Sequence, residues 1–155
     1  MAALEKFGPD ISKDAEWIAK TDHAVEAAHN FDWDHVLRGE IKRGDAKGYH
    51  AESSADGSAR IKPGAEISYH DNGVYEAKVE IWNQNSKRWK DKFVKSSFFP
   101  ADWSVARIKY EVIEAFKVRE SSPEKLLQWV GTSPSGIRIE GYAINGTITF
   151  YPKGN

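Results

Sequence analysis

The chain has 155 residues, the size of one ordinary domain, and its apolar content of 40% is enough for one hydrophobic core. It contains no cysteine, which excludes disulfides, thiol nucleophiles and cysteine-based zinc sites. A formal net charge of -1 excludes a polybasic nucleic-acid binder, and no stretch approaches the ~20 apolar residues of a membrane span. No apolar segment follows Met1, so we predict no signal peptide.

Helical patterns dominate the beginning of the chain. Apolar spacing predicts a helix over residues 12–30, capped by Ser12, and a short second helix over 34–41. Residues 42–60 are rich in Gly, Ser, Asp and Ala, and we expect them to form a loop.

From residue 60 onward the apolar pattern has a period of two, which predicts strands. Asp71-Asn72-Gly73 is expected to close a hairpin through a type I′ turn, and Asn145-Gly146 a second hairpin. The expected strands cover residues 61–69, 74–82, 89–99, 126–132, 136–144 and 146–152.

One helix interrupts these strands. It is expected over residues 103–118, where apolar residues form a stripe, and Ser121-Ser122-Pro123 should stop it. The order of elements predicts an α+β fold, in which a helical N-terminal lobe precedes an antiparallel β-sheet lobe with one interrupting helix.

A basic strip with interleaved aromatic residues lies in the middle of the chain. Its five cations fall within nine residues, around Trp89 and Phe93, with Asp91 the sole acid among them. Such a strip is typical of a nucleic-acid-binding surface, although lysines also protect a solvated edge strand, and both interpretations stay open. The cations are Lys87, Arg88, Lys90, Lys92 and Lys95.

Histidines are the main candidates for catalysis, because the chain lacks a Gly-x-Ser-x-Gly elbow, a phosphate-binding glycine loop and an HExxH motif. His23, His29 and His70 are expected to be surface or structural residues. His35 and His50 flank the glycine-rich loop, which can bring their rings together. One imidazole could then accept a proton while the other donates one, as RNA cleavage by its own 2′-hydroxyl requires, with a lysine of the basic strip as the cation.

Four short motifs, in this order, resemble those of the EndoU endoribonucleases. His35 and His50 match the two catalytic histidines of that family, which stand in a His-x-x-x-Gly-acid context and after a glycine-rich loop. The third motif resembles a segment of the bacterial EndoU toxins, and the fourth is similar to the closing T-x-Y-P motif. The motifs are DHVLRGE at 34–40, GYH at 48–50, KFVKSSFFPADWS at 92–104 and GTITFYP at 146–152.

The resemblance covers about residues 33–152 and implies an EndoU, or BECR-type, ribonuclease fold. It divides the chain into an N-terminal helical part, 1–32, and a catalytic domain, 33–155, within one compact domain. The helical lobe would supply both histidines, and a β-lobe across a cleft would supply lysine, serine, threonine and tyrosine.

Individual site residues follow from the same resemblance. Lys92 matches the catalytic lysine, with Lys95 as its rival, and Ser96 matches a serine that contacts the uracil base. Tyr151 would pack against a ribose or base. Glu40 would support neighbouring site residues that contact the substrate. In full, the expected catalytic residues are His35, His50, Lys92 and Tyr151, and the expected substrate-binding residues are Glu40, Lys95, Ser96 and Thr149.

The activity implied by the resemblance is cleavage of single-stranded RNA at uridine-containing sites, giving a 2′,3′-cyclic phosphate and a 5′-hydroxyl. His50 would be the base and His35 the acid. No metal or cofactor is expected, although some eukaryotic relatives need manganese, so a metal-dependent nuclease stays open.

The bacterial relatives imply a toxin domain of a larger secreted protein, of the contact-dependent inhibition or polymorphic toxin kind. It would act in a bacterial cytoplasm on an RNA such as a tRNA loop, and a cognate immunity protein would block it. The alternatives are a stand-alone housekeeping ribonuclease and an RNA-binding or partner-binding module without catalysis.

Overall fold

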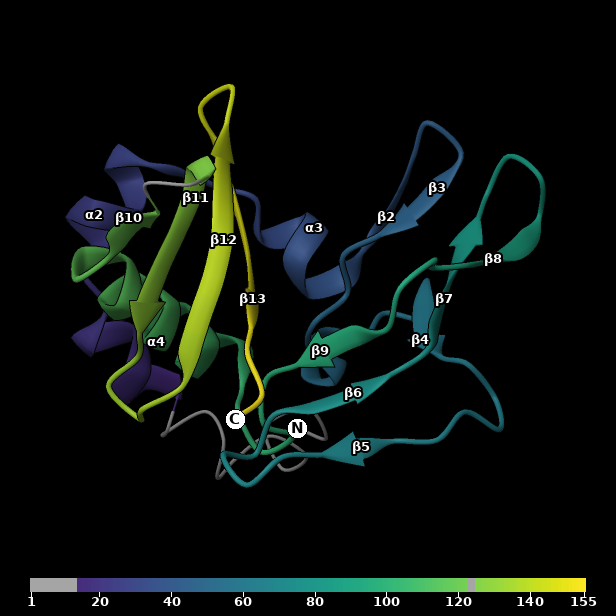
Figure 1. Ribbon diagram of the computed structural model, residues 1–155, viewed down its shortest axis with the longest axis horizontal. Coiled ribbons are helices and arrows are strands. Elements are labelled where there is room, and N and C mark those ends of the chain that lie inside the picture. Colours follow the sequence, from purple (N-terminus) through teal and green to yellow (C-terminus); the bar gives the residue numbers. More distant parts are fainter. Residues whose placement is uncertain (1–13, 123–124) are drawn as a thin grey trace, which may run out of the picture.

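In the computed structural model, which describes residues 14–122 and 125–155, helices cover one face of a five-stranded sheet, and three smaller sheets lie beside it (Figure 1). The expected α+β class, with N-terminal helices and one helix interrupting the strands, is confirmed. No helix in the described part of the chain is long and apolar enough to cross a membrane. The helices are residues 14–20, α2 (His23–Ala28), α3 (Trp33–Arg38), the 3-10 turn η1 (Glu52–Ser54) and α4 (Val105–Lys117).

The five-stranded sheet has the order β1-β13-β12-β11-β10. Its β1 strand pairs in parallel with β13, whereas every other pair among the described strands is antiparallel. The strands are β1 (Asn30–Phe31), β10 (Glu120–Ser122), β11 (Lys125–Thr132), β12 (Arg138–Ile144) and β13 (Thr147–Pro152).

The smaller sheets have the orders β2-β3, β4-β7-β8 and β5-β6-β9. Their strands are β2 (Glu40–Lys42), β3 (Asp45–Lys47), β4 (Ala59–Ile61), β5 (Ser68–Tyr69), β6 (Tyr75–Ala77), β7 (Val79–Asn83), β8 (Arg88–Asp91) and β9 (Ser96–Phe98).

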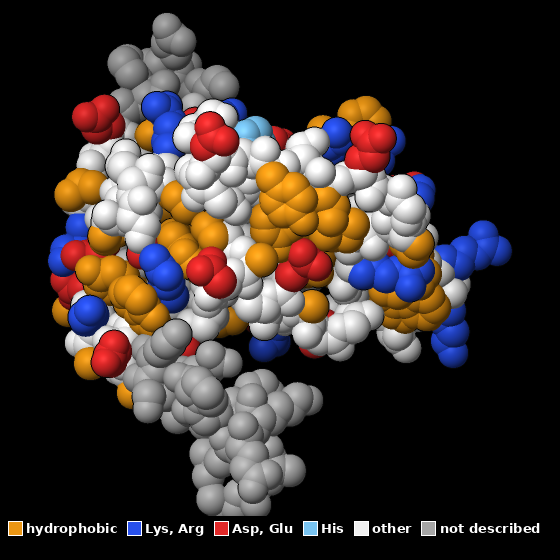
Figure 2. Space-filling view, turned by 90° about the horizontal axis from the view of Figure 1, so that it is seen from below, with side chains coloured by type: hydrophobic (Ala, Val, Ile, Leu, Met, Phe, Trp, Pro, Cys, Tyr) orange, Lys and Arg blue, Asp and Glu red, His pale blue; other side chains and the backbone are white. Residues whose placement is uncertain are grey.

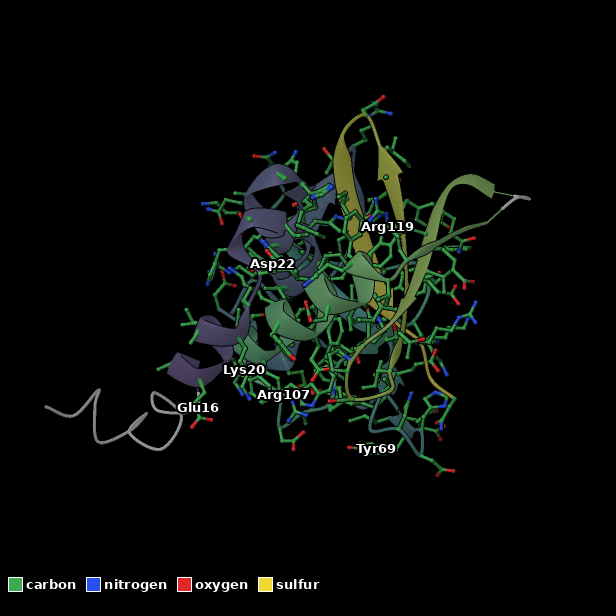
Figure 3. All side chains as sticks on the ribbon, turned by 90° about the vertical axis from the view of Figure 1, so that its left-hand side faces the viewer. Glu16, Lys20, Asp22, Tyr69, Arg107 and Arg119 are labelled. Carbon is green, nitrogen blue, oxygen red and sulfur yellow. The ribbon has the colours of Figure 1, made fainter. Side chains whose placement is uncertain are left out.

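The prediction of one continuous helix over 12–30 is wrong. Its described part forms two helices that meet at Asp22 (Figure 3). The Asp22 carboxylate accepts a hydrogen bond from the Val25 N–H at 3.1 Å and so caps α2. A second Asp22 oxygen pairs with the Lys117 ammonium of α4 at 3.1 Å. The expected cap, Ser12, lies outside the described residues.

The second expected helix ends earlier than predicted, at Arg38, because Gly39 takes a φ of 78° and turns the chain into β2. The loop expected over 42–60 is also wrong in part, since it contains β3, η1 and the start of β4. These strands have only three residues each and bury little more than Ala46 and Ala59, so their apolar signal is weak.

The first three expected strands are each divided in two. Residues 62–67 separate β4 from β5, Lys78 separates β6 from β7, and residues 92–95 separate β8 from β9. In every case the two halves belong to different sheets.

The two predicted hairpins differ in their turns. Asn145 and Gly146 both have positive φ, 52° and 79°, and join β12 to β13 as predicted. The first hairpin also forms, but its type I′ turn is wrong, because only Gly73 has a positive φ there. Its N–H bonds to the His70 carbonyl at 3.1 Å.

The end of the chain follows the prediction closely. Helix α4 is capped by the Ser104 hydroxyl, which accepts from the Arg107 N–H at 3.2 Å, and the last three strands are present. Helix α4 ends at Lys117, before Ser121 and Ser122, which belong to β10, and Pro123 lies outside the described residues.

Two hydrophobic clusters form the interior. The larger lies between the helices and the five-stranded sheet, and the smaller lies among the three small sheets. The chain passes from one cluster to the other at three crossings. At two of them the residues are adjacent, because successive side chains of an extended segment point to opposite sides, and at the remaining one, Tyr49 has a left-handed φ of 69°. The crossings are Tyr49 with Ala51, Val74 with Tyr75, and Phe98 with Phe99, and His50 lies at the first of them.

Helix α4 packs directly on β11 at Gly131, where an added Cβ would lie 2.1 Å from the Ala115 carbonyl oxygen. We expect Gly131→Ala to lower the free energy of unfolding by about 2 kcal/mol or more, because backbone atoms must move apart. Thr132→Ala, at an exposed neighbouring position, should change it by less than ~0.5 kcal/mol. Urea titration followed by circular dichroism measures both, and equal midpoints for the two variants would contradict this packing.

Candidate active site

A cleft of about 1170 Å³ opens where α3, the β8–β9 connection and the end of β13 come together. All four residues predicted to be catalytic line it: His35, His50, Lys92 and Tyr151. Of the residues predicted to bind substrate, Lys95 lines the cleft, whereas Glu40, Ser96 and Thr149 do not. The structure therefore brings together side chains that are more than a hundred residues apart in the chain.

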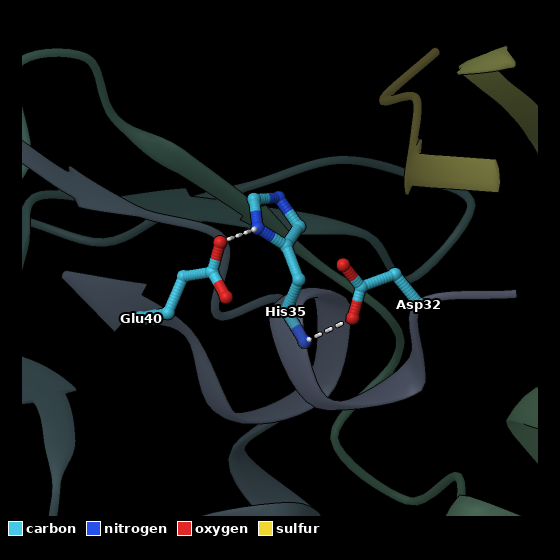
Figure 4. Close-up of side chains that lie close together, drawn as sticks. All are labelled: Asp32, His35 and Glu40. Carbon is cyan, nitrogen blue, oxygen red and sulfur yellow. Dashed lines mark hydrogen bonds and ion pairs between the residues drawn. The ribbon is translucent and has the colours of Figure 1, made fainter. Parts of the chain in front are cut away.

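His35 lies in the first turns of α3, a helix that Asp32 caps by accepting from the His35 backbone N–H at 3.2 Å. Its ring nitrogen Nδ1 is 3.2 Å from an oxygen of Glu40, the first residue of β2 (Figure 4). Because an ionised carboxylate only accepts hydrogen bonds, Nδ1 carries the hydrogen in this contact. Nε2 is then the nitrogen that can exchange a proton with a ligand.

His50 lies at the crossing between the two clusters and is only 8% exposed. Its backbone is held by Val36 and Phe99, through bonds of 2.7 and 2.9 Å. Its ring Nδ1–H donates to the Ser97 carbonyl at 2.5 Å, which leaves an electron pair on Nε2. Burial, together with the charge of Lys92, lowers the pKa of His50 to about 3, so the ring is a neutral proton acceptor at physiological pH.

Lys92 lies at the start of the β8–β9 connection and reaches back to the segment before His50. Its ammonium donates to the Gly48 carbonyl at 3.2 Å and to the Ser96 hydroxyl at 2.8 Å, and Ser96 itself donates to Gly48 at 3.0 Å. Burial lowers the pKa of Lys92 to about 8, so the ammonium still predominates at pH 7. Two of its three N–H groups are used in the described structure, which leaves one for a ligand.

The Ser96 side chain is fully buried, and its hydroxyl orients Lys92 rather than facing the cleft. Its contact with uracil stays a prediction.

Gly48 is a site residue that the sequence reasoning missed. It has a φ of 82°, and an added Cβ would lie 1.9 Å from the His35 carbonyl oxygen. Only glycine fits so close to α3 with this backbone conformation. Its place in the GYH motif was the available signal.

Tyr151 lies on β13 with its ring 6.2 Å from that of His50. Its hydroxyl donates to Glu140 at 3.2 Å, and burial beside that carboxylate raises the pKa of Tyr151 to about 12. It is therefore a neutral, rigid wall of the cleft. Thr149 lies two residues earlier on the same face of β13, half-buried, outside the cleft lining.

Lysines dominate the charge of the cleft. Seven line it, against three acids, and one of those acids, Asp91, is paired with Lys62 at 2.7 Å. Seen from below, Lys and Arg side chains project from the end of the molecule that carries β7 and β8 in Figure 1 (Figure 2). The seven are Lys47, Lys62, Lys78, Lys90, Lys92, Lys95 and Lys153, so the cleft suits a polyanion.

Two of the other three histidines lie outside the cleft lining, and the third has hydrogen-bond partners of its own. His29 packs edge-on against Phe116 at 4.9 Å, and His23 is exposed. His70 lines the cleft, but its ring is bonded to Glu76 at 2.6 Å and to the Asn155 carbonyl at 3.2 Å.

Asp32, His35 and Glu40 are the described residues that could hold a metal ion, with one ligand atom each within 4.8 Å of one another. Two carboxylates and an imidazole fit a cation such as Mn²⁺. Both carboxylates already have partners, however, because Asp32 caps α3 and Glu40 binds His35 (Figure 4). Activity without metal stays a prediction.

Residues 30–154 match the family described as bacterial EndoU nuclease, and the chain belongs to that family, which confirms the resemblance seen in the motifs. The chain is also 38% identical, over 109 residues, to a protein from Bacillus cereus named Toxin. That match covers 70% of this chain and 19% of the relative, and no solved structure matches the chain.

Two of the histidines that line the cleft, His50 and His70, have pKa values shifted in opposite directions. As the pH falls from 8, His70 should take up its proton above the ordinary pKa of 6.5, because Glu76 raises its pKa. Buried His50 should stay neutral until the pH approaches its lowered pKa of about 3. Imidazole ¹⁵N and ¹³C shifts measured across this range, with His50→Ala and His70→Ala for assignment, test the order. A His50 signal that titrates near pH 6.5 would contradict the assigned burial.

Proposed function

We propose that this nuclease cleaves single-stranded RNA at uridine-containing sites, by attack of a 2′-hydroxyl on the adjacent phosphate. One observation carries the proposal, which is that three suitable groups share one lysine-rich cleft. They are a neutral His50 with a free Nε2, a His35 whose ring is paired with the Glu40 carboxylate, and the Lys92 ammonium, which has a spare N–H. Acid, base and cation are the three groups that this reaction needs.

In the proposed reaction, Nε2 of His50 takes the proton of the 2′-hydroxyl as the 2′-oxygen bonds to phosphorus. Protonated His35 gives its proton to the 5′-oxygen as the bond from phosphorus to that oxygen breaks. Glu40 forms an ion pair with His35 in its charged form. The products are a 2′,3′-cyclic phosphate and a 5′-hydroxyl.

Lys92 is the better candidate for the cation that stabilises the phosphorane. Its ammonium is fixed by Gly48 and Ser96, whereas Lys95 is exposed and has no such anchors in the described structure. A fixed charge in a partly dry site stabilises a transition state more than a mobile charge in water.

A toxin role is the second part of the proposal. The similarity to a protein named Toxin supports it, and the match to 19% of that protein suggests a domain of a larger secreted polypeptide. The domain would then act in the cytoplasm of a target bacterium, on an RNA such as a tRNA loop, and the producing cell would need an immunity protein that blocks the cleft.

An oligoribonucleotide with a single uridine tests the reaction. We expect one cut beside the uridine, cyclic-phosphate ends, no cleavage of the matching DNA and full activity in EDTA. His35→Ala and His50→Ala should each lower kcat by about 10²-fold or more, while circular dichroism shows that both variants remain folded. Ends other than cyclic phosphate would contradict the mechanism, and loss of activity in EDTA would indicate a metal at Asp32, His35 and Glu40 instead.

Paired lysine variants test the choice of cation. Lys92→Ala should lower kcat by about 10²-fold, because the charge near the phosphorane is lost. Lys95→Ala removes the same charge from an exposed position of the same connection and should change kcat by less than about threefold. Single-turnover rates at saturating enzyme measure both, and the reverse order would show that Lys95 is catalytic.

A further inference from the structure

Phe93 differs from every other described phenylalanine. Five of the six are buried in the two hydrophobic clusters, whereas Phe93 is 100% exposed and its neighbour Val94 is 59% exposed. A single exposed apolar side chain needs no explanation by itself. The position of Phe93 does, because it lines the lysine-rich cleft next to Lys92.

The connection that carries Phe93 is short and fixed at both ends. It has four residues, 92–95, between β8 and β9. At its start the Lys92 N–H donates to the Val79 carbonyl at 3.0 Å, and the Lys92 ammonium is bound to Gly48 and Ser96. At its end Ser96 is fully buried and pairs with Ala77. The backbone of Phe93 is therefore fixed next to the lysine that we assign to the phosphorane, and its exposed side chain lines the same cleft.

The charges around Phe93 indicate what covers it. Lys92 and Lys95 border the Phe93–Val94 pair, and the exposed Lys90 lines the same cleft. An apolar protein surface would meet these ammonium groups and leave them without partners. A single nucleic-acid strand satisfies both elements, because its phosphates pair with lysines and its bases stack on aromatic rings.

We propose that Phe93 is a stacking platform for the base of a nucleotide that flanks the scissile phosphate. This inference rests on the proposed function and adds a binding subsite to it. Phe93 is a positioning residue: it touches no reacting atom, but a base stacked on it fixes the strand relative to Lys92, His35 and His50. Because every base has a flat π face, the subsite adds affinity with little discrimination among bases.

Binding to an uncleavable strand tests the contact without catalysis. The probe is a fluorescent oligoribonucleotide whose single uridine is replaced by 2′-deoxyuridine, and anisotropy gives its Kd. Phe93→Ala should raise Kd by about 5- to 150-fold, the range for loss of one base–aromatic stack. Phe93→Trp should keep Kd within about threefold, and Phe93→Leu should resemble Phe93→Ala.

Tyr69→Ala is the matched control, since Tyr69 is 73% exposed but lies outside the cleft lining (Figure 3). It should leave Kd unchanged. All these side chains are exposed, so the thermal midpoints should stay together. An unchanged Kd in Phe93→Ala would overturn the proposal and leave the 92–95 connection as a surface for a protein partner. A Leu variant that binds like the wild type would overturn stacking as its basis.

Cleavage of strands with one abasic nucleotide, moved through the positions around the uridine, locates the base. At one position the abasic substitution and Phe93→Ala should each lower kcat/KM, and the two together should lower it no further. If the losses in kcat/KM from Phe93→Ala and from the abasic substitution are additive at every position, the stacking proposal is overturned. Cleavage of the RNA in the same experiment would still support the proposed function. A wild-type protein that cuts no RNA contradicts the proposed function, and the stacking proposal, which needs a scissile phosphate, falls with it.

Discussion

The contact between residues 48–50 and the end of α3 is the constraint on which the site depends. The Tyr49 and His50 N–H groups donate to the carbonyls of His35 and Val36, and Gly48 lies so close to His35 that a Cβ would not fit. The Gly48 carbonyl then receives Lys92 and Ser96 from the smaller sheets. One three-residue segment thus sets the relative positions of His50, His35 and Lys92. Tyr49 has a left-handed φ of 69°, a strain of about 1–3 kcal/mol that its complete burial can offset.

Burial sets the protonation states of these groups and also costs free energy. An ammonium and an imidazole lose hydration when they leave water, which is why the pKa values of Lys92 and His50 both fall. Backbone and hydroxyl oxygens replace part of the lost water. They belong to Gly48, Ser96 and Ser97, and they hold the donors in fixed directions. The polar groups nearest the cleft therefore define geometry, and stability comes from the apolar clusters on either side.

Much of this arrangement was predictable from the sequence, because long elements and histidine context are local signals. The periodic stripe of α4, the last three strands and the Asn145-Gly146 turn were recognised in this way. The divisions of the middle strands were not, since alternation shows that Val74, Tyr75, Phe98 and Phe99 are apolar but not which cluster each one enters. The anchoring role of Gly48 depends on a helix that ends ten residues earlier, so the GYH motif marks the residue but does not reveal this role.

The division of the site between the clusters also differs from the arrangement that the family resemblance implied. Lys92 and Ser96 do come from the small sheets, but Thr149 and Tyr151 lie on β13, in the sheet that packs against the helices. The cleft thus separates Tyr151 and His35 from Lys92, and the chain crossings at His50 and at Phe98–Phe99 connect its two sides. Because the same chain segments contribute residues to both clusters, the backbone itself fixes the position of one cluster relative to the other. The cleft can therefore be open while the candidate site residues keep their relative positions, because His50, one of them, lies on a segment that joins its two walls.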